Sequence, residues 1–211
     1  MAQFLPTFNS VQENVDLAKS GEIGYKNDGD ELEEIEIDES LSKGNEKYTY
    51  YFIVDRSGSM MGDKIKITRQ SMKLFMQSLP LDSQFAIVSF GSEYRYTLSE
   101  EPIEYNDENL ELCKVEIGRF EADFGGTDIL EPLKSVFQRG NQQKSKTLKR
   151  IFLLTDGCVG NTDIIISTIK THCKDDGMWK LFTFGIGDGC SRHLVIEAAK
   201  AGRGDYSFVD E

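Results

Sequence analysis

Residues 50–60 of the chain read YYFIVDRSGSM. The aromatic and β-branched run that ends at Val54 is typical of a buried strand. The run stops at Asp55, and hydroxyls follow at the alternate positions Ser57 and Ser59. Ligands of open α/β sheets bind in the crevice outside the carboxyl ends of the strands. Because these side chains offer only hard oxygen atoms, they predict a site for Mg²⁺ or Mn²⁺ rather than for zinc.

The rest of the chain alternates apolar strand patterns with amphipathic helical patterns. Single helices between strands imply right-handed crossovers, so we predict an α/β fold. It is a doubly wound, mostly parallel, Rossmann-like central sheet with helices on both faces and one antiparallel edge strand, 93–98. The predicted strands are 48–54, 84–90, 93–98, 149–155, 179–185 and 205–209, and the predicted helices are 63–79, 107–117, 127–137, 162–173 and 192–201.

Length and charge limit the possible functions. The 211 residues suffice for one domain and a tail, and the net charge of −12 makes nucleic acid and anionic membranes poor partners. No stretch is apolar enough to insert into a membrane, and the first residues show no signal peptide. The cysteines lack metal-ligand spacing, so we expect unpaired thiols and a cytoplasmic protein. They are Cys113, Cys158, Cys173 and Cys190.

We expect two parts, a flexible acidic N-terminal arm over residues 1–46 and a folded domain over residues 47–211. Residues 28–39 are crowded with Asp and Glu, which favours a solvated arm. A Ca²⁺ loop is the alternative, but the spacing of an EF-hand is not met. Leu32, Ile35 and Ile37 leave room for a docking segment, and an acidic side chain of the arm could contact the metal of a neighbouring molecule.

Three separated segments are predicted to meet at one edge of the sheet. Asp55 ends the first strand, Gly125-Gly126-Thr127-Asp128 precedes a helix, and Asp156-Gly157 ends another buried strand. Two carboxylates side by side repel each other unless a cation or a proton lies between them. Mg²⁺ prefers six oxygen ligands and keeps some of its waters, so these groups leave one position open. A Glu or Asp of another protein is the natural sixth ligand.

The pattern Asp55-x-Ser57-x-Ser59, followed by Thr127 and Asp156-Gly157, resembles the metal-ion-dependent adhesion site (MIDAS) of von Willebrand factor type A domains. The resemblance runs from about Tyr48 to Val209. It implies that Ser57, Ser59 and Thr127 are direct or near-direct ligands, and that Asp55 and Asp156 bind directly or through water. Other segments resemble the branch of inter-α-trypsin inhibitor heavy chains, whose usual last helix is missing here. They are Leu154-Thr155-Asp156-Gly157 with Gly160-Asn161, Phe184-Gly185-Ile186-Gly187-Asp188, and Gly202-Arg203-Gly204.

Two functions of different classes follow. The first is a non-enzymatic module that binds an acidic side chain of a partner protein through Mg²⁺, with Mn²⁺ or Ca²⁺ as alternatives. The second is a Mg²⁺-dependent phosphoryl-transfer enzyme with Asp55 as nucleophile. Such an enzyme needs a second carboxylate two residues after its nucleophile as acid and base. That position is Ser57 in this sequence, so we favour the binding module. The residues expected to form the partner-binding rim are Arg56, Met60, Met61, Tyr94 and Phe124.

Overall fold

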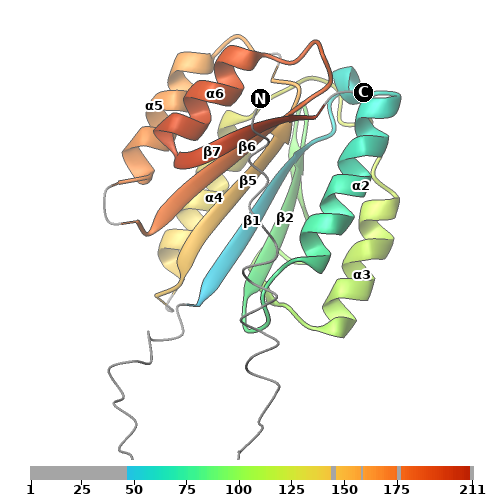
Figure 1. The fold of residues 1–211 in the computed structure, drawn as a ribbon, viewed down its shortest axis with the longest axis vertical. Helices are drawn as coiled ribbons and strands as arrows, with labels where there is room; N and C mark the ends of the chain where they lie inside the picture. The colour runs from blue at the N-terminus through green and yellow to red at the C-terminus, as the bar shows by residue number, and fades with distance from the viewer. Residues whose placement is uncertain (1–46, 144–145, 158, 175–176, 210–211) are drawn as a thin grey trace, which may run out of the picture. The chain divides into compact units, whose positions relative to one another are not determined.

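The computed structural model of the protein describes residues 47–143, 146–157, 159–174 and 177–209. The predicted acidic arm and Cys158 lie outside the described residues. The described part is built on a seven-stranded sheet (Figure 1). Six strands follow the order β3-β2-β1-β5-β6-β7, and the seventh, β4, pairs with β2. None of the described helices has both the length and the apolar character needed to cross a bilayer.

Strand β1 (Tyr48–Asp55) lies in the middle of the sheet because it is apolar on both sides. It pairs in parallel with β2 (Gln84–Phe90) and with β5 (Leu148–Thr155). The sheet continues in parallel through β6 (Trp179–Ile186) to β7 (Arg203–Val209). The register sets Val54 opposite Leu154, so the last residues of the two strands, Asp55 and Thr155, lie at the same edge of the sheet.

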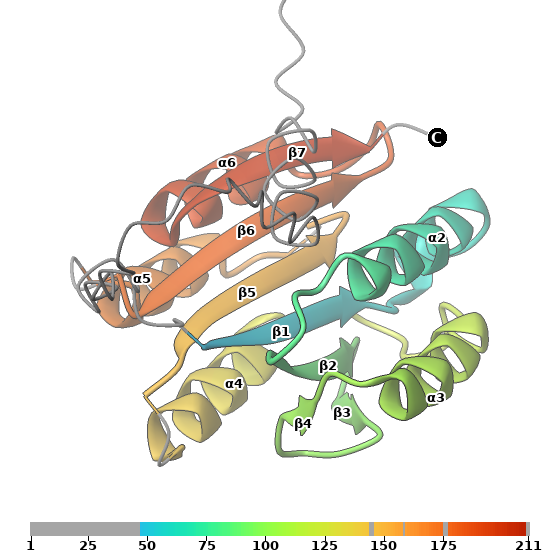
Figure 2. The same cartoon turned by 60° about the horizontal axis from the view of Figure 1, so that its bottom comes forward.

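Helices cover both faces of the sheet (Figure 2). Helices α2 (Asp63–Gln77) and α3 (Asp107–Gly118) cover one face. Helices α4 (Leu130–Gln142), α5 (Thr162–His172) and α6 (Arg192–Ala201) cover the other. Successive side chains of a strand point to opposite faces, so β1 serves two cores. Tyr51 and Ile53 pack with α4, α5 and α6, whereas Phe52 and Val54 pack with α2 and α3.

The predicted fold class is confirmed, and the differences are local. Strand β3 (Tyr94–Thr97) is the antiparallel strand expected over 93–98, and the two-residue β4 (Ile103–Glu104) beside it is an addition. Helix α4 begins at Leu130 rather than Thr127. The Asp128 carboxylate accepts a hydrogen bond from the Leu130 backbone N–H at 3.0 Å, which leaves residues 127–129 as an entry turn.

Three of the described cysteines are buried: Cys113, Cys173 and Cys190. Burial raises the pKa of both Cys113 and Cys190, that of Cys113 to about 12. A raised pKa keeps the thiol protonated, so neither side chain is a reactive nucleophile at neutral pH. Both residues therefore act as small packing groups.

Trp179 fixes the packing of α4 on the sheet. Its ring stacks on Tyr51 at 5.8 Å and meets the edge of Phe137 at 5.0 Å, and its indole N–H donates to the Asn141 side chain at 3.2 Å. Gly140 of α4 lies directly against this ring. A Cβ added at Gly140 would stand 2.3 Å from the Trp179 ring, so a side chain there requires the helix to move.

We expect Gly140→Ala to destabilise the protein by about 1–3 kcal/mol, the usual cost of overpacking, although Ala is normally the better residue inside a helix. The matched control is Gly118→Ala, because a Cβ there comes no closer than 3.8 Å to the Lys73 ammonium. Urea unfolding measures both changes. Equal free energies of unfolding for the two variants would show that α4 can shift without loss.

Candidate metal centre

Asp55 leaves the end of β1 with its carboxylate fully buried. One carboxylate oxygen, Oδ1, accepts the Ser57 backbone N–H at 2.9 Å. The other, Oδ2, accepts the Thr155 hydroxyl at 2.5 Å. Burial raises the pKa of Asp55, the hydrogen bonds from Ser57 and Thr155 lower it, and the neighbouring Asp156 charge raises it. The net result is an elevated pKa, which means that burial makes the charged form of Asp55 less favourable than it is in water.

The two serines after Asp55 form a tight turn. Ser57 is buried and precedes the 3-10 helix η2 (Gly58–Met60), whereas Ser59 is exposed. Their hydroxyl oxygens lie 3.0 Å apart. A pair of hydroxyls this close can share one ligand, so the turn offers two neutral oxygen donors beside the Asp55 carboxylate.

The segment that carries Thr127 is attached to this turn by backbone hydrogen bonds. The Gly58 N–H donates to the Gly125 carbonyl at 2.7 Å, and the Phe124 N–H donates to the Arg56 carbonyl at 3.0 Å. Gly125 has a φ of 78°, which favours glycine. Ser92 supports the same loop, since its hydroxyl accepts the Gly126 N–H at 2.7 Å. Half-buried Thr127 is thereby brought to the edge where Asp55 ends.

Asp156 follows β5, next to β1, and is fully buried. Its Oδ2 lies 3.1 Å from the Lys64 ammonium, which reaches it from the first turn of α2. The following Gly157 has a φ of 67°, and its N–H donates to the Thr155 hydroxyl at 2.8 Å. Thr155 therefore links the two acidic segments, because the same hydroxyl donates to Asp55.

The residues predicted to hold a metal thus come from three loops at one edge of the sheet. Hydroxyls and carboxylates are the hard oxygen donors that suit Mg²⁺, Mn²⁺ or Ca²⁺. Across the described ranges, no three His, Cys, Asp or Glu side chains gather in a way that could hold a metal ion. A divalent ion at this edge would therefore depend on the serine and threonine hydroxyls as much as on the two carboxylates.

The predicted rim residues lie in different environments. Met61 is 72% exposed and Tyr94 is 41% exposed, so both are open to a partner, and Phe124 is half-buried. The prediction that Met60 lies on the exposed rim is wrong, because Met60 is fully buried. The one-turn helix η2 directs Met60 inward while Ser59 faces out.

Arg56 is only 12% exposed and binds inside the protein. Its guanidinium lies 4.9 Å from the Phe120 ring centre and 4.4 Å from that of Phe124. It donates to the Glu121 carbonyl at 2.8 Å and to the Asp123 carboxylate at 2.6 Å. Arg95 also lies over the Phe124 ring, 5.6 Å from its centre. We call Phe120, Arg56, Phe124 and Arg95 the rim stack, and it fixes the second loop against the first.

Sequence reasoning missed three supporting residues, Thr155, Lys64 and Ser92. Thr155 lies within the motif that carried the family resemblance, so a polar residue at the end of a buried strand was the available signal. Lys64 and Ser92 gave no comparable signal, because each contacts the site across a long stretch of chain. The Lys64 contact spans 92 residues and the Ser92 contact spans 34.

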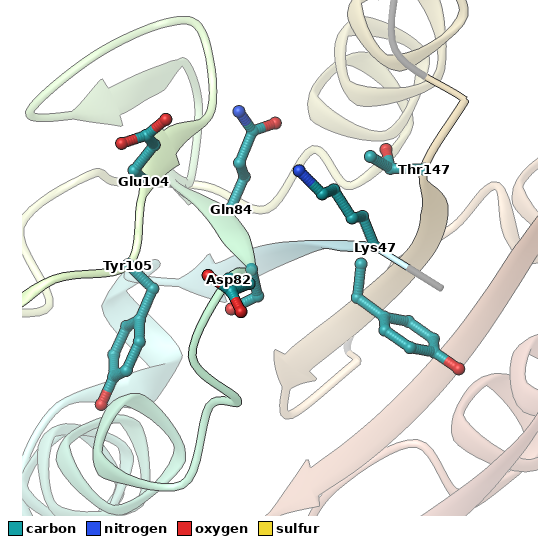
Figure 3. Close-up of a pocket in the computed structure, with 8 residues that line it drawn as sticks. Lys47, Asp82, Gln84, Glu104, Tyr105 and Thr147 are labelled. Atoms are coloured by element: carbon teal, nitrogen blue, oxygen red, sulfur yellow. The ribbon is translucent and has the colours of Figure 1, made fainter. Parts of the chain in front are cut away.

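A polar pocket of about 250 Å³ lies at the opposite edge, where the parallel strands begin (Figure 3). Lys47, Asp82 and Glu104 line it together with Tyr105. Its two carboxylates come from loop and edge-strand positions, and Ser83 and Thr147 also line it. The residues predicted to hold a metal lie at the other edge, so Asp82 serves below as a control position.

The sequence profile of the von Willebrand factor type A domain matches residues 51–208, which span β1 to β7. The chain belongs to the von Willebrand factor type A (vWA) domain family. Such domains commonly act as protein-interaction modules. The finer resemblance to inter-α-trypsin inhibitor heavy chains stays a prediction.

Similar proteins come from distant organisms. A von Willebrand factor A domain-containing protein of Dictyostelium discoideum is 32% identical over 169 residues, which are 80% of this chain and 18% of that protein. Von Willebrand factor A domain-containing protein 5A of Rattus norvegicus is 31% identical over 76% of this chain and 20% of its own length. The chain thus corresponds to about a fifth of each relative.

Solved structures share the fold at lower identity. A von Willebrand factor type A protein from Catenulispora acidiphila superposes with a TM-score of 0.68 at 21% identity, covering 79% of this chain and 39% of that one. The pilus adhesin SpaC from Lactobacillus rhamnosus GG gives a TM-score of 0.61 at 15% identity, covering 79% and 28%. At these identities the comparison supports the fold alone.

Thr155→Val keeps the shape of the side chain and removes its hydroxyl. It deprives the buried Asp55 oxygen of a donor and the Gly157 N–H of an acceptor, so we expect a loss of about 1–3 kcal/mol in the free energy of unfolding. Chemical denaturation in the presence of chelator measures it. Thr155→Ser retains the hydroxyl and is the control. A Val variant as stable as the Ser variant would contradict the linking role.

Asp55→Asn tests the elevated pKa. The fold raises the pKa of Asp55 above its ordinary value of 3.8, so the folded protein keeps this proton to a higher pH than the unfolded chain. The free energy of unfolding of the wild type therefore falls as pH rises through that interval, and Asn lacks this contribution. With chelator present, we expect the wild type to lose stability relative to Asp55→Asn as the pH rises above 3.8, the ordinary pKa of the group. If the free energies of unfolding of the wild type and Asp55→Asn changed in parallel with pH, the raised pKa of Asp55 would be contradicted.

Proposed function

We propose that this vWA domain is a divalent-metal-dependent protein-binding module. It would bind a Glu or Asp side chain of a partner protein through Mg²⁺ at the carboxyl edge of the sheet. The observation that supports it most is the meeting of two buried carboxylates, Asp55 and Asp156, with the hydroxyl pair of Ser57 and Ser59. The vWA family, in which interaction modules are common, agrees with this function.

The arrangement suits a metal that binds and does not react. The hydroxyls of Ser57, Ser59 and Thr127 would hold the ion directly, and Asp55 and Asp156 would hold it directly or through water. An ion held in this way keeps an open position and attracts an anionic oxygen, which is what a partner carboxylate offers. Mn²⁺ and Ca²⁺ can use the same donors. The expected cytoplasmic location stays a prediction.

Two exposed side chains beside the site would meet the partner. Met61 and Tyr94 are open, and large flexible or aromatic groups adapt well to protein surfaces. Phe124 is half-buried and two arginines lie over its ring, so its position is fixed. We therefore propose these three residues as the partner-binding rim.

The alternative is phosphoryl transfer by Asp55. The structure brings Lys64 to the site, and a cation there could neutralise a phosphate. However, Asp55 is fully buried and both of its carboxylate oxygens accept hydrogen bonds. The position two residues after Asp55, where such an enzyme needs a second carboxylate as acid and base, is Ser57, so we favour a metal-holding role for Asp55.

Calorimetric titration of Mg²⁺ and Mn²⁺ into chelator-treated protein tests the metal site. We expect saturable binding at one site in the wild type and binding at least about tenfold weaker in Asp55→Asn, because a ligand charge is lost. Asp82→Asn is the matched control. Asp82 lies at the opposite edge and has a φ of 65°, which Asn tolerates.

Equal binding by the wild type and Asp55→Asn would contradict the metal site. A partner screen with and without chelator follows from a positive result. Turnover of p-nitrophenyl phosphate by the Mg²⁺-loaded wild type, abolished in Asp55→Asn, would instead support the enzymatic alternative.

A further inference from the structure

Lys64 is a charged residue inside the candidate metal centre that the proposed function does not use. Its ammonium lies 3.1 Å from Asp156 Oδ2, its side chain is only 18% exposed, and Asp156 is fully buried. Burial strengthens such an interaction, because little water remains to screen the two charges. Lys64 is therefore part of the electrostatics of this edge and not a surface charge.

Two charged side chains close to Asp55 and Lys64 in the sequence pair with other residues. Arg56 pairs with Asp123 at 2.6 Å within the rim stack, and exposed Asp63 pairs with Lys66 at 2.8 Å. Our charge count takes the two carboxylates predicted to hold the metal, Asp55 and Asp156, and the Lys64 ammonium that is paired with Asp156. Their formal charges leave the site at −1, and a divalent ion would change it to +1.

The positive charge of Lys64 has opposite effects on the binding of the divalent ion and on the later binding of a partner carboxylate. Lys64 repels a divalent ion that approaches the carboxylates, since like charges in a buried site repel strongly. Once the ion is bound, the same ammonium leaves the site positive, and a partner carboxylate then makes it neutral. Without Lys64 the carboxylates alone would neutralise the ion, and the loaded site would attract an anion less.

We propose that Lys64 is a specificity-determining residue of this edge. It weakens binding of the divalent ion and strengthens capture of an anionic ligand by the ion-loaded site. The inference rests on the proposed function, because it assumes that a divalent ion binds between the loops. It goes further by assigning the preference for an acidic ligand to a protein side chain as well as to the metal.

The test uses variants that change the charge of one helix turn. Lys64→Met removes the charge and keeps the aliphatic stem, whereas Lys64→Gln removes the charge and keeps a donor for Asp156, which protects folding. Lys66→Met is the matched control, because Lys66 lies on the same helix and is 61% exposed. Calorimetry of Mn²⁺ binding to chelator-treated protein gives the first readout.

The second readout is displacement of water from bound Mn²⁺ by acetate, followed by water proton relaxation. We expect both Lys64 variants to bind Mn²⁺ about tenfold or more tightly than the wild type, and to bind acetate several-fold less tightly once loaded. Lys66→Met should match the wild type in both. Opposite changes in the two affinities are not expected from a purely structural ion pair.

The outcomes separate the inference from the function on which it rests. Wild-type protein that binds no Mn²⁺ would overturn the proposed function and the inference with it. Wild-type protein that binds Mn²⁺, with Lys64 variants whose Mn²⁺ and acetate affinities are unchanged or change in the same direction, would overturn the inference alone. Tighter Mn²⁺ binding with weaker acetate binding in Lys64→Gln would support it even if Lys64→Met did not fold.

Discussion

The parallel pairing of β1 with β5 is the constraint on which the candidate site depends. Its register brings Asp55 and Asp156 out of the sheet beside each other, and both are fully buried. Two buried carboxylates raise the free energy of the folded state unless other groups compensate. The Thr155 hydroxyl, the Ser57 N–H and the Lys64 ammonium supply that compensation. Much of the surrounding loop structure can be understood as the means of holding these three groups in place.

The sequence was sufficient for the fold and for the meeting of the three loops. Strand ends in a parallel sheet share one edge, so a residue after one apolar run must lie near the residue after its neighbour. The same reasoning works for Asp55 and Asp156 because the strands that precede them are unambiguous. Thr127 was identified only by its place in the motif that resembles the MIDAS, because no local sequence pattern singles it out.

Side-chain direction and long-range contacts were harder to predict. Met60 follows two hydroxyl residues and was expected on the rim, but a single 3-10 turn is enough to send it into the interior. Arg56 follows Asp55 directly, and its inward direction is decided by two rings far along the chain, Phe120 and Phe124. Lys64 is one of several lysines on its helix, and nothing in its neighbours marks it as the one that reaches Asp156.

Under the proposed function, the rim stack would have a consequence for the kinetics of partner binding. Phe120, Arg56, Phe124 and Arg95 are ordered when the domain folds, so the conformational entropy of the second loop is lost at that stage rather than on encounter. A partner that meets a preformed surface does not wait for a loop to close, and its association rate is set by diffusion and orientation. Differences in affinity among partners of this domain would then reside mainly in how long each complex lasts.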